Sequence, residues 1–189
     1  SIFFIERLSK EFNGELDLAL EIFKNTYPKE FLHQLVSSQL DMDRMDYLNR
    51  DSFYTGVNEG KIGSDRIIEM MNVVNGKLVL EEKGIYSIEK FIVARRLMYW
   101  QVYLHKTVVA AECMLIQALR RAKELKQKGT ALFTSPALNY FLENNVSAED
   151  FKSDPKVLER FALLDDYDIL GAIKVWQSES DKVLSELSK

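Results

Sequence analysis

The segment SSQLDMDRMDYLNRDSFYTG, residues 37–56, mixes four aspartates and two arginines with methionine, leucine and tyrosine. We expect it to form a helix, because its apolar residues recur at helical spacing. On a helix, Asp43, Tyr47 and Asp51 stand at positions i, i+4 and i+8, so their side chains lie along one edge. The segment therefore predicts a helix, from about Leu40 to Tyr54, with two carboxylates and a phenol on a single edge.

The other side of this helix is predicted to pack inward, through Met45, Leu48 and Ser52. The polar edge has two interpretations that the residues alone leave open. It is either a solvated surface with intrahelical ion pairs such as Asp46–Arg50, or a functional edge. In the second case a carboxylate would bind a metal and the guanidinium of Arg44 would bind phosphate.

A second stretch, ARRLMYWQVYLHK at residues 94–106, repeats this arrangement, with Arg95, Tyr99 and Tyr103 four residues apart. Arginine binds phosphate through two parallel hydrogen bonds, and tyrosine offers a ring and a hydroxyl to a sugar or base. These residue types at this spacing favour a nucleotide pocket. Trp100 fits the hydrophobic core better.

The rest of the chain reads as helices separated by Gly, Pro and Asn, with one exception. Residues 73–80, VVNGKLVL, place Asn75-Gly76 between apolar and β-branched residues, which predicts a β-hairpin. A long helix is predicted from Ile88 to about Leu125. The fold class is all-α with one small hairpin, in a single domain over residues 1–189.

Composition excludes several classes of function. A net charge of −4 and a pI near 5.4 argue against a general nucleic-acid or anionic-membrane surface. Cys113 is the only cysteine, so no intramolecular disulfide forms, and its apolar neighbours predict that it is buried. We expect a cytoplasmic protein with no membrane segment. Because the chain opens with SIFFIERL and has no initiator Met, we also expect it to be a piece of a longer one.

Two motifs are set aside. Residues 56–61, GVNEGK, resemble a phosphate-binding loop but have one residue too few between the glycines, and Ile62 replaces the Ser or Thr that binds magnesium. The two histidines, His33 and His105, are interpreted as structural or interfacial.

The segments described above resemble the HD-domain phosphohydrolases, and within them the deoxynucleoside triphosphate triphosphohydrolases. The resemblance rests on LDMDRMDYLNRD with the following TG (40–56), the Asn-Gly hairpin, ARRLMYWQVYLHK, and FALLDDYDI (161–169). It implies an HD-type helical bundle around a metal held by a His, a His-Asp dipeptide and a distant Asp. Only the last Asp is present, so the resemblance implies a fragment that lacks the N-terminal part.

The resemblance also implies roles for individual residues. Asp43 would be the catalytic metal ligand. The other active-site positions would bind the substrate. Arg44 and Arg95 would contact its phosphates, Tyr47 and Asp51 would bind the deoxyribose hydroxyl, and Tyr103 would line the sugar pocket. Tyr99 would also lie in the substrate site, at a position where the family carries a histidine.

Two further positions correspond to residues that bind an activating nucleotide between subunits. These are Arg66 and Lys83, whereas Glu81 stands where another effector-binding arginine is expected. A nucleotide effector and a homo-oligomer are therefore implied.

The implied activity is metal-assisted hydrolysis of a deoxynucleoside triphosphate to deoxynucleoside and tripolyphosphate, by a divalent metal whose identity (Mg, Mn, Fe or Zn) the sequence does not distinguish. The fragment is expected to be inactive alone. Two alternatives remain: an HD phosphohydrolase for another phosphate ester, and a nucleotide-binding regulatory or assembly module without catalysis. No specific nucleic acid is expected as a partner.

Overall fold

The computed structural model describes residues 1–189, which fold as two compact units, Ser1–Lys106 and Thr107–Lys189. We call them the N-terminal unit and the C-terminal unit. The prediction that they act as one domain stays a prediction.

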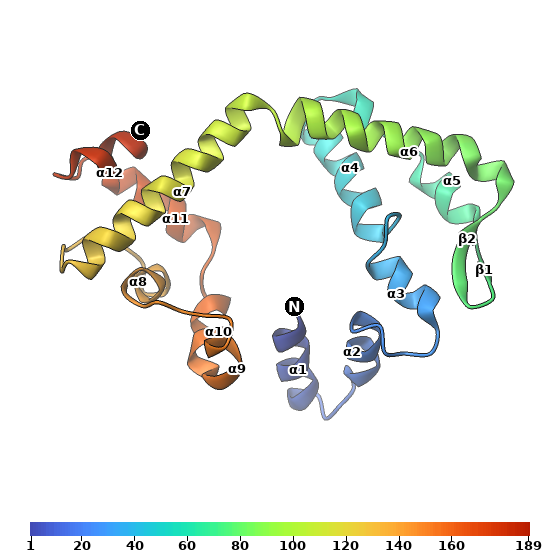
Figure 1. The fold of residues 1–189 in the computed structure, drawn as a ribbon, viewed down its shortest axis with the longest axis horizontal. Coiled ribbons are helices and arrows are strands. Elements are labelled where there is room, and N and C mark those ends of the chain that lie inside the picture. Colours follow the sequence, from blue (N-terminus) through green and yellow to red (C-terminus); the bar gives the residue numbers. More distant parts are fainter. The chain divides into compact units, whose positions relative to one another are not determined.

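The elements are almost all helical (Figure 1). The N-terminal unit contains α1 (Ile2–Glu11), α2 (Asp17–Phe23), α3 (Glu30–Val36), α4 (Met42–Thr55), η1 (Asn58–Gly60), α5 (Ser64–Glu69), β1 (Met71–Val74), β2 (Lys77–Leu80), η2 (Glu82–Gly84), α6 (Ile85–Met98) and η3 (Tyr99–Tyr103). Helix α7 (Lys106–Gln127) begins at the last residue of this unit and leads into α8 (Pro136–Glu143), α9 (Asp150–Ser153), α10 (Pro155–Ala162), α11 (Asp166–Trp176) and α12 (Lys182–Leu187). The predicted fold class, all-α with one small hairpin, is confirmed.

The hairpin forms where Asn75-Gly76 predicted it. Strands β1 and β2 pair antiparallel, with Met71 opposite Leu80 and Val74 opposite Lys77. Asn75 and Gly76 have φ angles of 52° and 77°, and positive φ at both central residues is what a type I′ turn requires. The turn chemistry therefore determines the register of this hairpin.

The core of the N-terminal unit joins α4, α5 and α6. Its buried residues are Met45, Leu48, Ile62, Ile67, Phe91, Ala94 and Met98. Met45, Leu48 and Ser52 are all buried, so the predicted inward side of α4 is confirmed. Gly60 is needed here, because a Cβ at that position would lie 2.5 Å from the sulfur of Met98.

The predicted long helix from Ile88 to Leu125 is wrong in its continuity. Helix α6 ends at Met98 and is followed by η3, a π-helical turn in which the amide of Leu104 donates to the carbonyl of Tyr99 at 2.7 Å. Helix α7 begins at Lys106, with two residues between it and the end of η3. A π-turn contains more residues than the 3.6 of an α-turn and therefore shifts the side-chain register. No local spacing signals this insertion.

Two predicted core positions are also wrong. Trp100 is 60% exposed, and its ring stacks with the guanidinium of Arg96, whose Cζ lies 4.5 Å from the ring centroid. Cys113 is exposed, because α7 buries only residues from Ala118 onward.

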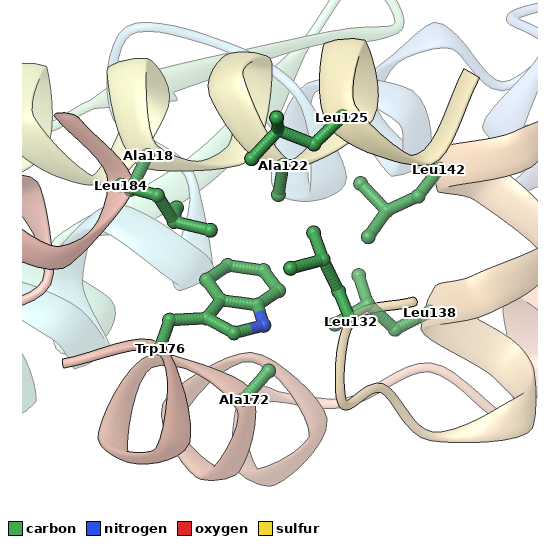
Figure 2. Packing of buried hydrophobic residues seen from close by; sticks show 9 residues of the cluster. All are labelled: Ala118, Ala122, Leu125, Leu132, Leu138, Leu142, Ala172, Trp176 and Leu184. Atoms are coloured by element: carbon green, nitrogen blue, oxygen red, sulfur yellow. The ribbon is translucent and has the colours of Figure 1, made fainter. Parts of the chain in front are cut away.

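The core of the C-terminal unit surrounds Trp176 (Figure 2). The indole lies between α7 and α11, close to Ala122 and Leu184, and its N–H donates to the carbonyl of Phe133 at 3.0 Å. Arg121 of α7 donates to both carboxylate oxygens of Asp181 at 3.1 and 2.6 Å, and these hydrogen bonds lower the pKa of Asp181 to about 2. This unit is thus held by an apolar core and a bidentate ion pair.

No single helix is long and apolar enough to cross a membrane; only the bent pair Glu82–Tyr103 and Lys106–Gln127 reaches that length and composition when its two parts are counted together.

Candidate functional site

Asp41, a buried aspartate directly before α4, caps the first turn of this helix. The carboxylate of Asp41 accepts hydrogen bonds from the amides of Arg44 at 2.8 Å and Ser38 at 3.2 Å. Aspartate is favoured at this position because it satisfies amides that have no partner within the helix. At the other end, Gly56 has a φ of 73°, the left-handed conformation that commonly ends helices. The ends of α4 are therefore determined by local chemistry, and they orient its polar edge.

The polar edge of α4 faces η3 at two of its three predicted positions. The hydroxyl of Tyr103 donates to Oδ2 of Asp51 at 2.7 Å. The Tyr47 ring packs edge-on against the Tyr103 ring, with centroids 6.0 Å apart, and Tyr99 packs against Tyr103 at 5.3 Å. Two helical segments some fifty residues apart in sequence thus meet through three phenols and one carboxylate.

The two predicted phosphate-binding arginines come from different helices and both interact with the turn before α4. Nε of Arg44 donates to the carbonyl of Ser38 at 3.0 Å and lies 3.4 Å from Oδ2 of Asp41. Nη1 of Arg95 donates to Oε1 of Gln39 at 3.1 Å. The Cζ atom of Arg95 also lies 5.8 Å from the centroid of the Tyr99 ring.

The pKa values of two of the phenols shift with burial and with the groups around them. Burial raises the pKa of Tyr47, the nearby phenol of Tyr99 raises it further, and the charges of Arg95 and Arg44 oppose the shift. Burial, followed by the hydrogen bond to Asp51, raises the pKa of Tyr103 well above its usual range. Both phenols are therefore neutral near pH 7 and can donate hydrogen bonds. We call Arg44, Tyr47, Asp51, Arg95, Tyr99 and Tyr103 the Arg-Tyr cluster.

The π-turn η3 places two members of this cluster. Within this turn the Tyr99 and Tyr103 rings are in contact, with centroids 5.3 Å apart, while Trp100 between them in sequence is exposed. π-turns are frequent at functional sites.

A neighbouring edge of α4 matches the simpler interpretation of the helix charges, a solvated surface with an ion pair. Asp46 and Arg50 form the predicted ion pair at 2.6 Å, and both side chains are more than half exposed. The helix therefore has a solvated edge with an ion pair and a second polar edge directed at η3.

Asp43, the predicted metal ligand, is exposed and makes no hydrogen bond or ion pair. No group of three or more His, Cys, Asp or Glu side chains in the chain is placed to hold a metal ion. A metal held by Asp43 would need further ligands beside it.

The two predicted effector residues lie elsewhere in the N-terminal unit. Arg66 of α5 is exposed and pairs with Glu69 at 3.5 Å, and Lys83 of η2 is exposed. Their segments are adjacent, since the amide of Glu81 donates to the carbonyl of Met70 at 2.9 Å. No hydrogen bond or ion pair joins either residue to the Arg-Tyr cluster.

Sequence reasoning missed two residues that organise the site. Asp41 had a readable signal, because an aspartate directly before an apolar helical pattern is a typical N-cap. Gln39 had none, because its partner Arg95 is 56 residues away. Only the packing of α6 near the start of α4 brings the two together.

The chain is similar to a protein family model and to a solved structure. The family model described as the HD associated region matches residues 62–145. The crystal structure of a phosphohydrolase from Bacteroides thetaiotaomicron VPI-5482 superposes on 99% of the chain with a TM-score of 0.96 and 62% sequence identity, and the chain covers 46% of that structure.

Two curated relatives are more distant. The uncharacterised protein YwfO of Bacillus subtilis (strain 168) is 36% identical over 170 residues, which are 89% of this chain and 37% of YwfO. A deoxynucleoside triphosphate triphosphohydrolase of Dictyostelium discoideum, the SAMHD1 homologue, is 29% identical over 102 residues, 51% of this chain and 20% of that protein. The chain therefore spans less than half the length of these relatives.

The chain is therefore similar in sequence and fold to part of a phosphohydrolase of known structure, and its residues 62–145 match the model of the HD associated region.

Proposed function

We propose that the chain forms the substrate-binding side of an HD-type phosphohydrolase that hydrolyses deoxynucleoside triphosphates to deoxynucleoside and tripolyphosphate. Two similarities support this proposal: the 62% identity to a phosphohydrolase of known structure, and the more distant similarity to a deoxynucleoside triphosphate triphosphohydrolase. Because the chain spans less than half of each, the activity belongs to a larger assembly of residues than the 189 described.

The observation that carries the proposal is the grouping of two guanidinium groups and three phenols. The charges of Arg44 and Arg95 both act on the Tyr47 phenol. The Tyr47 and Tyr99 rings pack against the ring of Tyr103, whose hydroxyl donates to Asp51. Arg44 and Arg95 would bind phosphate oxygens by charge-assisted hydrogen bonds, which are stronger than neutral ones. Tyr47 and Asp51 would hydrogen-bond the deoxyribose hydroxyl, and the Tyr103 and Tyr99 rings would line the sugar site. Phosphate and sugar are two of the three parts of a nucleotide, so these residues would bind both of them beside one edge of α4.

A divalent metal, when bound, would polarise a phosphoryl oxygen of the substrate. Asp43 would contribute one carboxylate ligand to it, and the other ligands would come from outside residues 1–189. The residues of this chain bind and orient the substrate, and the chain alone is expected to be inactive.

Product analysis tests the proposal. The complete gene product that contains these residues is incubated with each deoxynucleoside triphosphate and Mg²⁺ or Mn²⁺, with and without GTP, and the released phosphate species are separated by ion chromatography. We expect tripolyphosphate and free deoxynucleoside, and we expect Asp43→Ala to abolish both while the melting temperature stays unchanged. Release of single phosphates only would mean that the bond between the sugar and the α-phosphate is not the one cleaved, and would refute triphosphohydrolase activity.

Binding by the 189-residue chain gives a test that does not depend on turnover. We expect deoxynucleotide to raise its melting temperature, because a ligand that binds only the folded state stabilises it. Arg95→Ala should remove this protection. Arg96→Ala is the matched control, since Arg96 stacks on the exposed Trp100 ring instead. Equal loss of protection in both variants would show that Arg95 has no special role.

Thermal protection by deoxynucleotide, without hydrolysis by the complete gene product, would favour a nucleotide-binding regulatory or assembly module.

Arg66 and Lys83 are proposed to bind an activating nucleotide in a homo-oligomer. A stimulation of turnover by GTP that Lys83→Ala removes would support that role, and unchanged stimulation would refute it.

A further inference from the structure

One short turn holds both arginines of the Arg-Tyr cluster. Residues 38–41 directly precede α4, and within them the carbonyl of Ser38 accepts from Arg44 while the side-chain carbonyl of Gln39 accepts from Arg95. Asp41 holds the turn itself, through the amides of Ser38 and Arg44. The turn therefore connects the first turn of α4 to the last turn of α6.

The two arginines differ in how firmly they are held. Arg44 is 27% exposed, and its guanidinium has a backbone carbonyl and a buried carboxylate as partners. Arg95 has one hydrogen-bonded partner, Gln39, whose side chain is exposed, and a ring contact with Tyr99. A free arginine side chain has many rotamers, and ordering it upon ligand binding weakens affinity. Arg95 is thus the cation whose guanidinium is held by a single hydrogen bond, in addition to its ring contact.

Resting on the proposed function, we infer that Gln39 is a positioning residue: its Oε1 atom orients the Arg95 guanidinium so that it acts together with Arg44 on one polyphosphate. Gln39 accepts from Nη1, and the other guanidinium N–H groups of Arg95 remain as donors. The charges of Arg44 and Arg95 both act on the Tyr47 phenol, so the two groups are directed to the same region. Two like charges repel, and an uncharged acceptor holds Arg95 there without neutralising it.

The first test measures binding of inorganic tripolyphosphate to the 189-residue chain by isothermal titration calorimetry. Gln39→Met removes the acceptor and keeps the side-chain length. We expect affinity to fall roughly tenfold, as for loss of one hydrogen bond to a charged group. Gln101→Met is the matched control, because Gln101 is an exposed glutamine of η3 without a hydrogen-bond partner. The affinity of this variant for tripolyphosphate should equal that of the wild type.

A double-mutant cycle distinguishes positioning from a general structural role. If Gln39 acts through Arg95, then Gln39→Met should weaken binding less than about twofold in an Arg95→Ala background. The same loss in both backgrounds would refute the inference. If the wild-type chain does not bind tripolyphosphate, the proposed phosphate site itself is refuted, whereas binding that Gln39→Met leaves unchanged refutes only the role of Gln39.

The orientation of Arg95 can be measured without ligand. In ¹⁵N-labelled chain, the order parameter of the Arg95 Nε–H group should be high in the wild type and should fall in Gln39→Met, while that of Arg44 stays unchanged. Equal mobility of Arg95 in the two proteins would overturn the inference, whatever the affinity.

Discussion

The hydrogen bond between Tyr103 and Asp51 joins η3 to α4, and Tyr103→Phe removes it while keeping the ring. The bond is short, at 2.7 Å, and has a carboxylate acceptor. Hydrogen bonds to charged groups contribute about 1.5–3 kcal/mol when well shielded. Both side chains are only half-buried, so water can replace the lost donor, and we expect about 1 kcal/mol of destabilisation.

Native-state hydrogen exchange measures this effect in each unit separately. Amides of α4 that exchange through opening of the N-terminal unit should exchange roughly fivefold faster, the equivalent of about 1 kcal/mol. Amides of α7 after Ala118 lie in the core of the C-terminal unit and serve as an internal reference. Their exchange should not change.

The matched control is Tyr99→Phe, which deletes a phenol hydroxyl that makes no hydrogen bond and keeps the ring contact with Tyr103. Its effect on α4 exchange should be small. Equal effects of the two substitutions would refute the assignment of stability to the Tyr103–Asp51 bond, as would faster exchange in α7.

The same bond predicts a dependence on pH. The pKa of Tyr103 is raised in the folded chain above its unfolded value, which is about 10. The stability that the Tyr103–Asp51 hydrogen bond contributes is therefore fully present below about pH 10, and it is lost as the pH rises through the pKa of Tyr103 in the folded chain. The difference in urea midpoint between wild type and Tyr103→Phe should be constant from about pH 6 to 9 and narrow at higher pH. A difference in urea midpoint that widens above about pH 10 would contradict the direction of the pKa shift of Tyr103.

Three further substitutions test the fold around the site. Asp41→Ala should destabilise the chain by about 1–2 kcal/mol in urea unfolding, because it removes the cap of α4, and Asp41→Ser should restore part of this. Gly60→Ala should lower stability by about 1–3 kcal/mol, because the added methyl overlaps Met98; no change in the urea midpoint would mean that Met98 moves aside freely. Trp176→Phe should lower the protection of α7 amides against exchange without affecting α4, because it removes the hydrogen bond to Phe133 and leaves a void in the core of the C-terminal unit.

Local chemistry predicted the features that depend on a few neighbouring residues. The hairpin follows from Asn75-Gly76, since both residues accept positive φ. The two sides of α4 follow from helical spacing alone, and the burial of Met45, Leu48 and Ser52 bears this out. The alignment of Tyr47 and Asp51 on one edge is of the same kind.

Features that depend on distant contacts were predicted wrongly or not at all. The π-turn at residues 99–103 interrupts an apolar pattern that reads as one continuous helix, and Trp100 and Cys113 are exposed although their neighbours are apolar. A periodic pattern shows which residues share a side of a helix. It does not show whether another element covers that side.

The candidate site likewise has features that the sequence predicts locally and features that depend on distant contacts. The sequence by itself determined which side chains share each helix edge, because spacing along a helix is a local property, and the family resemblance suggested their chemistry. Only the tertiary structure decided that Asp51 meets Tyr103 and that Gln39 meets Arg95, at separations of 52 and 56 residues. Such pairs form when α4 and α6 pack on their shared core, and the geometry of that packing is not encoded in any single stretch of residues.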